Sequence, residues 1–175
     1  WAQREYQLTA SLGKKLGFEF SHSHHEKISI GYLSSDFREH AVSFLMAEIF
    51  ELHDRSRFNI TAYSYGADDG SALRKRLENT FDKFVDISGS SSADAAKIIA
   101  NDQIDILVDL TGYTGNNRTA ILALRPAPIQ VNYLGYAGTM GAEFVDYLIA
   151  DDFVIPATHQ KYYTEKIVRM PDCFM

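Results

Sequence analysis

The sequence predicts an α/β protein with a Rossmann-like, mostly parallel sheet and helices on both faces. Short β-favouring runs alternate with amphipathic segments from Ile28 onward, the order typical of right-handed β-α-β units. The run from Ile104 to Leu110 is almost continuously apolar, as expected for a strand covered on both faces. Gly, Ser, Thr and Asp gather directly after the strands, where parallel sheets of this kind bind ligands.

Composition narrows the class of protein. The chain has 175 residues, of which 46% are hydrophobic and 23% charged, enough for one domain with a real core. A net charge of −6 with scattered basic residues argues against nucleic acid or an anionic membrane as the main partner. The single cysteine, Cys173, excludes an intramolecular disulfide and fits a reducing compartment. No apolar run approaches the roughly 20 residues of a membrane span and no signal peptide is visible, so we expect a cytoplasmic protein.

The first 25 residues differ from the rest. They form a polar, weakly amphipathic lead-in with too few apolar side chains to pack alone. His22, His24 and His25 invite a metal interpretation, but no cysteine or carboxylate stands at ligand spacing nearby. We interpret this stretch as a solvated linker and the whole chain as a piece of something larger.

The first predicted elements follow from periodicity and capping residues. Residues 28–33 and 58–65 are β-favouring and predict two strands. Apolar residues between 42 and 50 recur at the spacing of one helical face. Ser71 predicts the start of a helix whose inner face carries Leu73, Leu77 and Phe81, with Arg74 mostly outward.

The later elements alternate in the same way. Residues 84–87 and 104–110 predict the third and fourth strands, separated by a helix that Ser91 and Asp94 introduce as a capping box. A helix capped by Asn116 and Asn117 is expected to stop near Arg125, because Pro126 disfavours helical geometry before it. The remaining predictions are strands at 129–134, 144–150 and 166–170, with a helix from Pro156 to about Tyr163.

Several common motifs are missing. Neither Gly-x-Gly-x-x-Gly nor the phosphate loop Gly-x-x-x-x-Gly-Lys-Ser/Thr occurs, which removes the usual dinucleotide and nucleoside triphosphate signatures. Gly-x-Ser-x-Gly is absent, so a hydrolase elbow has no support. No Asp-x-Asp triplet is present to hold a divalent ion against a sugar nucleotide. We therefore expect chemistry without a metal.

Two titratable residues stand at strand exits that the predicted topology makes neighbours. His40 lies at a helix start, where an imidazole can hydrogen-bond a phosphate or a sugar hydroxyl, and Asp109 can accept a proton. The structural alternatives are a helix-capping imidazole for His40 and, for Asp109, a carboxylate that accepts the amides of residues 112–114. The residues alone leave both pairs of interpretations open.

The loop from Gly135 to Gly141 also has two interpretations. Its exposed amides could face an anion, or its glycines could serve a tight connection that needs positive φ. We interpret Tyr32, Tyr133 and Tyr136 as core and rim aromatics rather than a sugar-stacking platform.

Six stretches that are collinear from about Ile28 to Phe174 carry a further signal. They are Ile-Gly-Tyr-Leu-Ser-Ser-Asp-Phe-Arg-Glu-His, Asp-Leu-Thr-Gly-Tyr-Thr, Leu-Arg-Pro-Ala-Pro-Ile-Gln-Val, Leu-Gly-Tyr-Ala-Gly-Thr, Val-Asp-Tyr-Leu-Ile-Ala-Asp and Met-Pro-Asp-Cys-Phe. Together these stretches resemble the first half of the catalytic region of the O-GlcNAc transferase/SPINDLY family.

The resemblance implies one lobe of a two-lobed GT-B glycosyltransferase that moves a sugar to Ser or Thr hydroxyls with inversion and without a metal or cofactor. It assigns residues 1–25 to a helical junction after tetratricopeptide repeats and 26–175 to the N-terminal lobe, with a second lobe beyond. UDP-GlcNAc is the expected donor and protein acceptors the expected partners. The alternatives are GDP-fucose, as in SPINDLY-type members, and a non-catalytic partner-binding module.

The resemblance also assigns residues. His40 matches the active-site histidine, Asp109 the proposed final proton acceptor, and Tyr113 with Thr114 the loop beside the sugar and acceptor. An exposed carboxyl with a pKa of about 4 is a weak base for a hydroxyl, so Asp109 is expected to act late and through water.

The Leu-Gly-Tyr-Ala-Gly-Thr motif supplies two further expected substrate-binding residues, Gly138 and Thr139. This chain departs from the family at Tyr113, where many members have His, and at Ala137, where many have Pro. Met140 replaces a common Ser or Thr. These departures bear on donor and acceptor geometry more than on the type of reaction.

Overall fold

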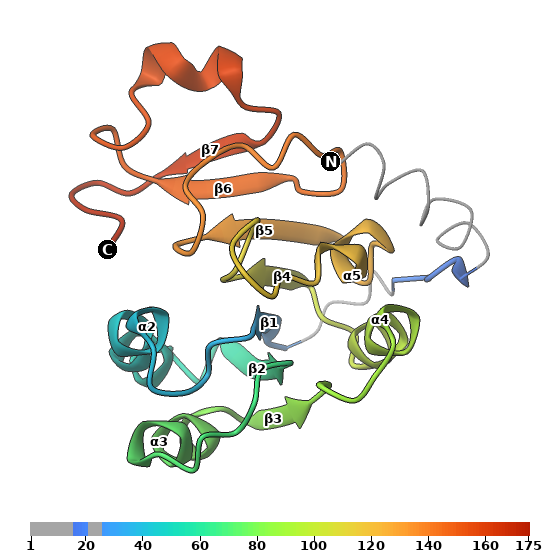
Figure 1. Ribbon diagram of the computed structural model, residues 1–175. Helices are drawn as coiled ribbons and strands as arrows, with labels where there is room; N and C mark the ends of the chain where they lie inside the picture. The colour runs from blue at the N-terminus through green and yellow to red at the C-terminus, as the bar shows by residue number, and fades with distance from the viewer. Residues whose placement is uncertain (1–15, 21–25) are drawn as a thin grey trace.

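The computed structural model describes residues 16–20 and 26–175 and shows one seven-stranded sheet with the order β3-β2-β1-β4-β5-β6-β7 (Figure 1). Every neighbouring pair of strands is parallel. The strands are β1 (Ile28–Ser34), β2 (Phe58–Ser64), β3 (Lys83–Asp86), β4 (Ile106–Asp109), β5 (Ile129–Tyr133), β6 (Tyr147–Ala150) and β7 (Lys166–Arg169). The predicted fold class is confirmed, and so is the predicted adjacency of β1 and β4.

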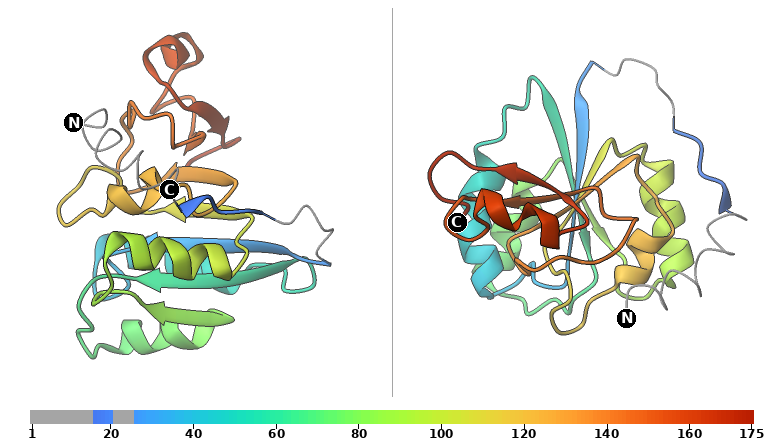
Figure 2. Two further views of the ribbon diagram at one scale, coloured as in Figure 1. Left: turned by 90° about the vertical axis from the view of Figure 1, so that its right-hand side faces the viewer. Right: turned by 90° about the horizontal axis from the view of Figure 1, so that it is seen from above.

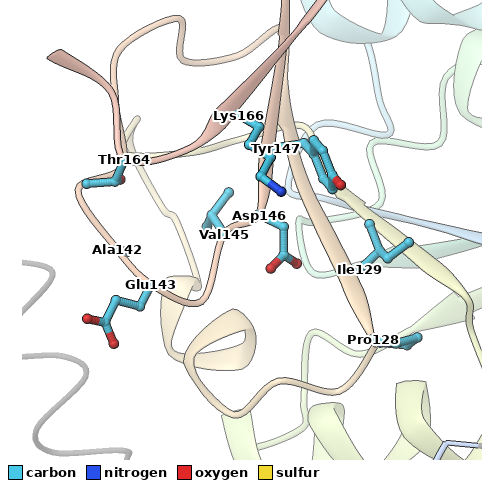
Figure 3. A pocket seen from close by; sticks show the side chains of 9 residues that line it. All are labelled: Pro128, Ile129, Ala142, Glu143, Val145, Asp146, Tyr147, Thr164 and Lys166. Carbon is cyan, nitrogen blue, oxygen red and sulfur yellow. The ribbon is translucent and has the colours of Figure 1, made fainter. Parts of the chain in front are cut away.

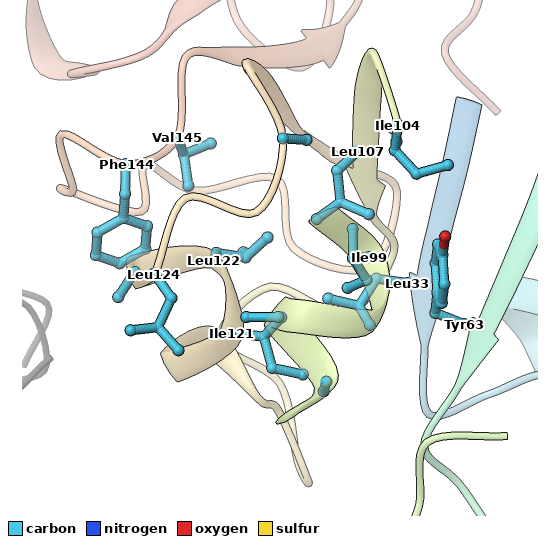
Figure 4. Close-up of a cluster of buried hydrophobic side chains, with 14 of the residues drawn as sticks. Leu33, Tyr63, Ile99, Ile104, Leu107, Ile121, Leu122, Leu124, Phe144 and Val145 are labelled. Atoms are coloured by element: carbon cyan, nitrogen blue, oxygen red, sulfur yellow. The ribbon is translucent and has the colours of Figure 1, made fainter. Parts of the chain in front are cut away.

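Helices cover both faces of the sheet (Figures 1 and 2). They are α2 (Ala41–Glu51), α3 (Ala72–Thr80), α4 (Ser92–Asn101), α5 (Thr119–Ala123) and the 3-10 helix η1 (Ala157–Tyr162). The first two pack on one face, where Met46, Phe50 and Leu77 join one buried cluster. Helices α4 and α5 pack on the other, where Ile99 and Ile121 join a second cluster (Figure 4). Each of the crossovers that contain α2 to α5 therefore buries an apolar stripe, as doubly wound sheets require.

Two predicted helix starts are confirmed by their capping bonds. The Ser71 hydroxyl accepts the Arg74 N–H at 3.1 Å, and the Ser91 hydroxyl accepts the Asp94 N–H at 3.1 Å. The Ser91 hydroxyl also donates to the Asp94 carboxylate at 2.7 Å. Both caps satisfy amides that an isolated helix end would leave free.

The predicted cap of the next helix is wrong. Helix α5 begins at Thr119, with Arg118 at the N-cap position and no side-chain capping bond. Asn116 has φ +59°, so the chain turns there instead of entering the helix. The segment after Pro156 is also shorter and tighter than predicted, because it forms a 3-10 helix with no buried residue.

Arg74, expected mostly outward, is only 4% exposed. Its guanidinium donates to the Phe37 carbonyl at 3.1 Å and to the Ser64 hydroxyl at 3.0 Å, and it lies 4.3 Å from the centre of the Phe84 ring. A flexible charged side chain can be buried in this way when carbonyl oxygens and an aromatic face replace water. Arg74 therefore ties α3 to the ends of β1 and β2.

The chain after β5 differs from the prediction in where β6 begins, and it has a smaller buried core of its own. Strand β6 begins at Tyr147, later than the predicted residue 144, and its small satellite core holds only Leu148, Ala150 and Ile155 as buried members.

None of the helices in the described residues is long and apolar enough to cross a bilayer. The three histidines of the lead-in and most of residues 1–25 lie outside the described residues, so those predictions remain untested.

Candidate functional site

The ends of four neighbouring strands come together at the carboxyl edge of the sheet. The Leu110 N–H donates to the Leu33 carbonyl at 3.0 Å, which joins the exits of β4 and β1. A Cβ on Gly66 would lie 1.8 Å from the Ser35 carbonyl oxygen, and one on Gly135 would lie 2.1 Å from the Leu110 carbonyl oxygen. Glycine is therefore needed at both places for the exits of β2 and β5 to pack against those of β1 and β4.

His40 is the N-cap residue of α2. Its Nδ1 accepts the Val42 N–H at 3.3 Å, which assigns the proton of the neutral ring to Nε2. The side chain is 39% exposed, and Asp36 Oδ2 lies 3.8 Å from Nδ1. The helix-capping interpretation is therefore confirmed, and it leaves an N–H of the same ring to donate to a ligand oxygen.

The backbone on either side of His40 is fixed by carboxylates and hydroxyls. The Ser43 hydroxyl donates to the Asp36 carbonyl, and the Asp69 carboxylate accepts the Glu39 N–H at 2.8 Å. The hydrogen bond from Glu39 is the main reason that the pKa of Asp69 falls to about 2. Asp69 therefore stays ionised and ties the β1 exit to the loop before α3.

Asp109 differs from the expectation of an exposed carboxylate. It is 3% exposed, and its two oxygens accept the Thr111 N–H at 3.1 Å and the Gly112 N–H at 3.0 Å. Burial raises its pKa to about 6, although the two amide bonds act in the opposite direction. The carboxylate organises its own loop, close to the structural alternative, and a pKa near 6 makes it a stronger base than an exposed aspartate.

A groove of about 470 Å³ opens beside these residues. It is lined by Ser35, Arg38, Tyr65, Gly66, Ala67, Asp69, Asn116, Asn117 and Arg118. The Arg118 guanidinium donates to the Ile87 and Ser90 carbonyls at 2.9 and 2.7 Å, so backbone oxygens hold it at the groove. Sequence reasoning missed Tyr65 and Arg118; it placed Tyr65 inside the second strand, which ends at Ser64 in the structure.

Tyr113 and Thr114 lie on the loop that Asp109 organises. The Thr114 hydroxyl donates to the Thr111 carbonyl at 2.8 Å. The rings of Tyr113 and Tyr136 meet edge to face with their centres 5.8 Å apart. Tyr113 and Thr114 therefore lie next to the exit of β4, where the Tyr136 ring packs against Tyr113.

Thr139 lies elsewhere. Its hydroxyl donates to Glu165 at 2.8 Å and accepts the Thr164 N–H at 3.3 Å, two residues that directly precede β7. The amino end of a parallel strand is opposite to the strand exits, so this hydroxyl is separated from His40 and Asp109. Gly138 contacts Tyr136, since a Cβ there would lie 2.8 Å from the ring.

A second cavity, of about 500 Å³, lies at the amino ends of β5, β6 and β7 (Figure 3). Asp146 and Lys166 are among its lining residues. The Arg125 guanidinium contacts the Asp146 carboxylate at 3.0 Å. Because it is at the opposite edge from the strand exits, this cavity is not part of the candidate site.

Within residues 16–20 and 26–175, no group of three His, Cys, Asp or Glu residues is arranged to hold a metal ion.

The family model for glycosyl transferase family 41 matches residues 9–175. A relative from Arabidopsis thaliana, named probable UDP-N-acetylglucosamine–peptide N-acetylglucosaminyltransferase SEC, is 43% identical over 85% of this chain and 15% of its own length. UDP-N-acetylglucosamine–peptide N-acetylglucosaminyltransferase of Caenorhabditis elegans is 44% identical over 89% of this chain and 14% of its own length. The corresponding enzyme named SPINDLY from Arabidopsis thaliana is 36% identical over 85% of this chain and 16% of its own length.

A solved structure gives the same result for the fold. A mutant O-GlcNAc transferase of Thermobaculum terrenum superimposes with a TM-score of 0.85 and 30% identity. The similarity covers 97% of this chain and 33% of that one. This chain thus spans about a seventh of the curated relatives and a third of the solved structure.

Proposed function

This chain belongs to glycosyl transferase family 41, the O-GlcNAc transferase/SPINDLY family, and on that premise we propose that it is the N-terminal catalytic lobe of a protein O-glycosyltransferase. The reaction transfers a sugar from a nucleotide donor to a Ser or Thr hydroxyl, with inversion and without a metal. The observation that carries the proposal is the placement of His40 and Asp109 at adjacent exits of β1 and β4, within a family match to residues 9–175.

UDP-GlcNAc is the donor that we propose, because the names of the relatives from Arabidopsis thaliana and Caenorhabditis elegans both specify it. The two are 43% and 44% identical to this chain, and the name of the SPINDLY relative, which is 36% identical, specifies the same donor. A second lobe completes the donor site, and upstream repeats present the protein acceptor. The reaction takes place in the cytoplasm.

His40 positions the reactants. With Nδ1 engaged by the Val42 amide, its Nε2–H donates to an oxygen of the donor or of the acceptor. The bonds around Asp36 and Asp69 fix the backbone of the loop that carries it. Such fixed placement lowers the activation barrier of the transfer, because the N–H group that donates the hydrogen bond does not have to reorient during the reaction.

Asp109 is the final proton acceptor. The acceptor hydroxyl becomes acidic as the glycosidic bond breaks, and its proton then passes through water to the carboxylate. A pKa of about 6 leaves Asp109 largely ionised at neutral pH and able to hold the proton transiently. Tyr113 and Thr114 line the path on the loop that Asp109 itself organises.

The test uses the full-length parent enzyme with a Ser/Thr-rich acceptor protein, a chelator, and either UDP-GlcNAc or GDP-fucose. Intact mass spectrometry should show one or more added N-acetylhexosamine units with UDP-GlcNAc alone. A sugar added only from GDP-fucose would overturn the donor and keep the reaction. No addition from either donor by a folded enzyme would favour the non-catalytic partner-binding module, and activity that returns only with a divalent ion would contradict the metal-free reaction.

The residue roles have their own test in the same assay. Asp109→Asn should reduce transfer by at least 100-fold. Asp105→Asn is a matched control, because Asp105 is a carboxylate that accepts the Ser29 amide at 2.8 Å at the opposite edge of the sheet. Full activity of Asp109→Asn would remove this carboxylate from the mechanism.

A further inference from the structure

Glu165, directly before β7, is a buried carboxylate with an exposed fraction of 1%. None of the ion pairs among the described residues includes it. Burying a carboxylate is costly unless strong hydrogen bonds replace its water. The bonds that Glu165 accepts therefore indicate what it is for.

Both oxygens of Glu165 are bound to the segment that connects β5 to β6. Oε1 accepts the Met140 N–H at 2.6 Å, and Oε2 accepts the Thr139 hydroxyl at 2.8 Å. These two bonds replace water at the buried carboxylate. This connection has no α-helix to hold it on the sheet, so the carboxylate adds a polar attachment to the burial of Met140 and Phe144 in the cluster that contains Ile99.

The Thr139 hydroxyl is fully used by this arrangement. It donates its proton to Glu165 and accepts the Gly141 N–H at 3.0 Å and the Thr164 N–H at 3.3 Å. A hydroxyl has one proton and two lone pairs, so none remains for a substrate. The geometry gives Thr139 a structural task in this state of the lobe.

The attached segment reaches the strand exits through Tyr136. A Cβ on Gly138 would lie 2.8 Å from the Tyr136 ring, and one on Gly112 would lie 2.4 Å from the Tyr136 Cβ. The Asn132 amide donates to the Tyr136 carbonyl at 2.7 Å, and the Tyr136 ring meets that of Tyr113. Tyr136 is thus wedged between the fixed segment and the loop that Asp109 organises.

We propose that Glu165 is a positioning residue for the glycosyl-transfer site: it fixes residues 139–140, and thereby Tyr136, which holds the loop of residues 111–114 in its working geometry. This inference rests on the proposed function for its effect on rate, but not for its effect on structure. Glu165 touches neither reactant. It acts from the amino edge of the sheet on a site at the carboxyl edge.

The experiment compares Glu165→Ala with wild type in the full-length enzyme, by steady-state kinetics and by amide hydrogen exchange. We expect kcat to fall by about 10-fold or more with KM for the donor changed by less than about threefold, because misplaced catalytic groups slow the reaction more than binding. Exchange should become faster both in peptides covering residues 135–141 and in peptides covering 110–116.

A second variant guards against misfolding of the first. Thr139→Val removes one bond to Glu165 and the acceptor of the Gly141 and Thr164 amides, but keeps the bond from the Met140 amide to Glu165, so it should show the same pattern. Thr80→Val is the matched control, because it makes the same substitution at a hydroxyl on α3 that donates to the Arg76 carbonyl at 2.8 Å, away from this network. In the double variant the effects of Glu165→Ala and Thr139→Val should be less than additive, as for residues of one network.

Two results separate the possible failures. If both variants speed exchange only in 135–141 and leave kcat within about twofold, Glu165 is a local scaffold and the proposal is overturned. If wild type transfers no sugar, the proposed function fails, but faster exchange in 110–116 still supports the link between Glu165 and that loop. Unchanged exchange there in both variants would contradict the link whatever the activity.

Discussion

Residues 28–133 and residues 134–175 hold their strands in place by different means. In the first region, helices α2 to α5 bury apolar side chains on both faces of the sheet, including Phe50 and Ile99 at 0% exposure. In the second region, η1 buries no residue and the satellite core is small. Phe144 and Val145 of this region join the cluster that contains Ile99, and buried polar side chains add to their contacts: Asp151 accepts the amides of Phe153, Val154 and Phe174.

This difference follows from how each connection can satisfy its backbone. A helix bonds its own amides and presents an apolar stripe, so hydrophobic burial alone can attach it. An irregular connection leaves amides and carbonyls that cannot be buried without partners. The second region therefore needs side chains such as Glu165 and Asp151 at fixed places, and the loss of one of them should loosen a segment locally.

The largest expected effect lies in the first region. Phe50→Ala removes a ring whose centre is 4.7 Å from that of Phe81 and 4.9 Å from that of Tyr32. Equilibrium urea unfolding should show a loss of about 3–5 kcal/mol, because the cavity cannot close completely. Phe44→Ala on the outer side of the same helix, where the ring is 65% exposed, should cost under about 1 kcal/mol. Equal losses in the two variants would contradict the assignment of the stabilising face.

The next largest loss of unfolding free energy is expected at Gln130, a buried side-chain amide where the two regions meet. Gln130→Leu removes donors to the Leu122 and Phe144 carbonyls and should cost about 2 kcal/mol, about 1 kcal/mol for each lost bond, because Arg125 still donates to both oxygens. Hydrogen exchange should rise mainly in residues 142–146. Asn79→Ala, which removes an exposed amide that donates to the Lys75 carbonyl, is the control and should cost about 0.5 kcal/mol or less. A neutral Gln130→Leu would mean that hydrophobic contacts alone hold the junction.

Asp109 should give a pH dependence of the opposite sign to ordinary acid denaturation. Its pKa is about 6 in the folded protein against an ordinary 3.8, so between these values the folded chain binds the proton and the unfolded chain does not. Its contribution therefore weakens as pH rises from about 4 to about 6. The stability of wild type relative to Asp109→Asn should fall by on the order of 2–3 kcal/mol from pH 4 to pH 7. A rise over that range would show that the folded-state pKa is depressed.

The smallest effect tests the edge of the sheet. Val168 on the edge strand β7 is 42% exposed, so Val168→Thr should change the free energy of unfolding by less than about 0.5 kcal/mol. Val131→Thr in the interior strand β5, where the side chain is 7% exposed, should cost above about 1 kcal/mol, because the new hydroxyl is buried. Similar costs at the two positions would mean that β7 is more deeply covered than the structure shows.

Residue periodicity and local capping signals were sufficient to predict the architecture. Alternating strand and helix periodicities predicted the parallel sheet, the reversal of order at β1 and the meeting of the His40 and Asp109 exits, because right-handed crossovers allow few other arrangements. Ser71 and Ser91 started helices where predicted, since capping is a local interaction. The family resemblance, carried by several collinear motifs, was confirmed by the family model that matches residues 9–175.

Tertiary structure decided the environment of each charged group. Nothing in local sequence shows that Arg74 is buried against Phe84, because that contact joins segments distant in the chain. The burial of Asp109 depends on the exits of neighbouring strands, and the place of Thr139 depends on Glu165, 26 residues away. Periodicity reports which face of an element is apolar, whereas the pKa, tautomer and hydrogen bonds of a side chain depend on what long-range packing brings beside it.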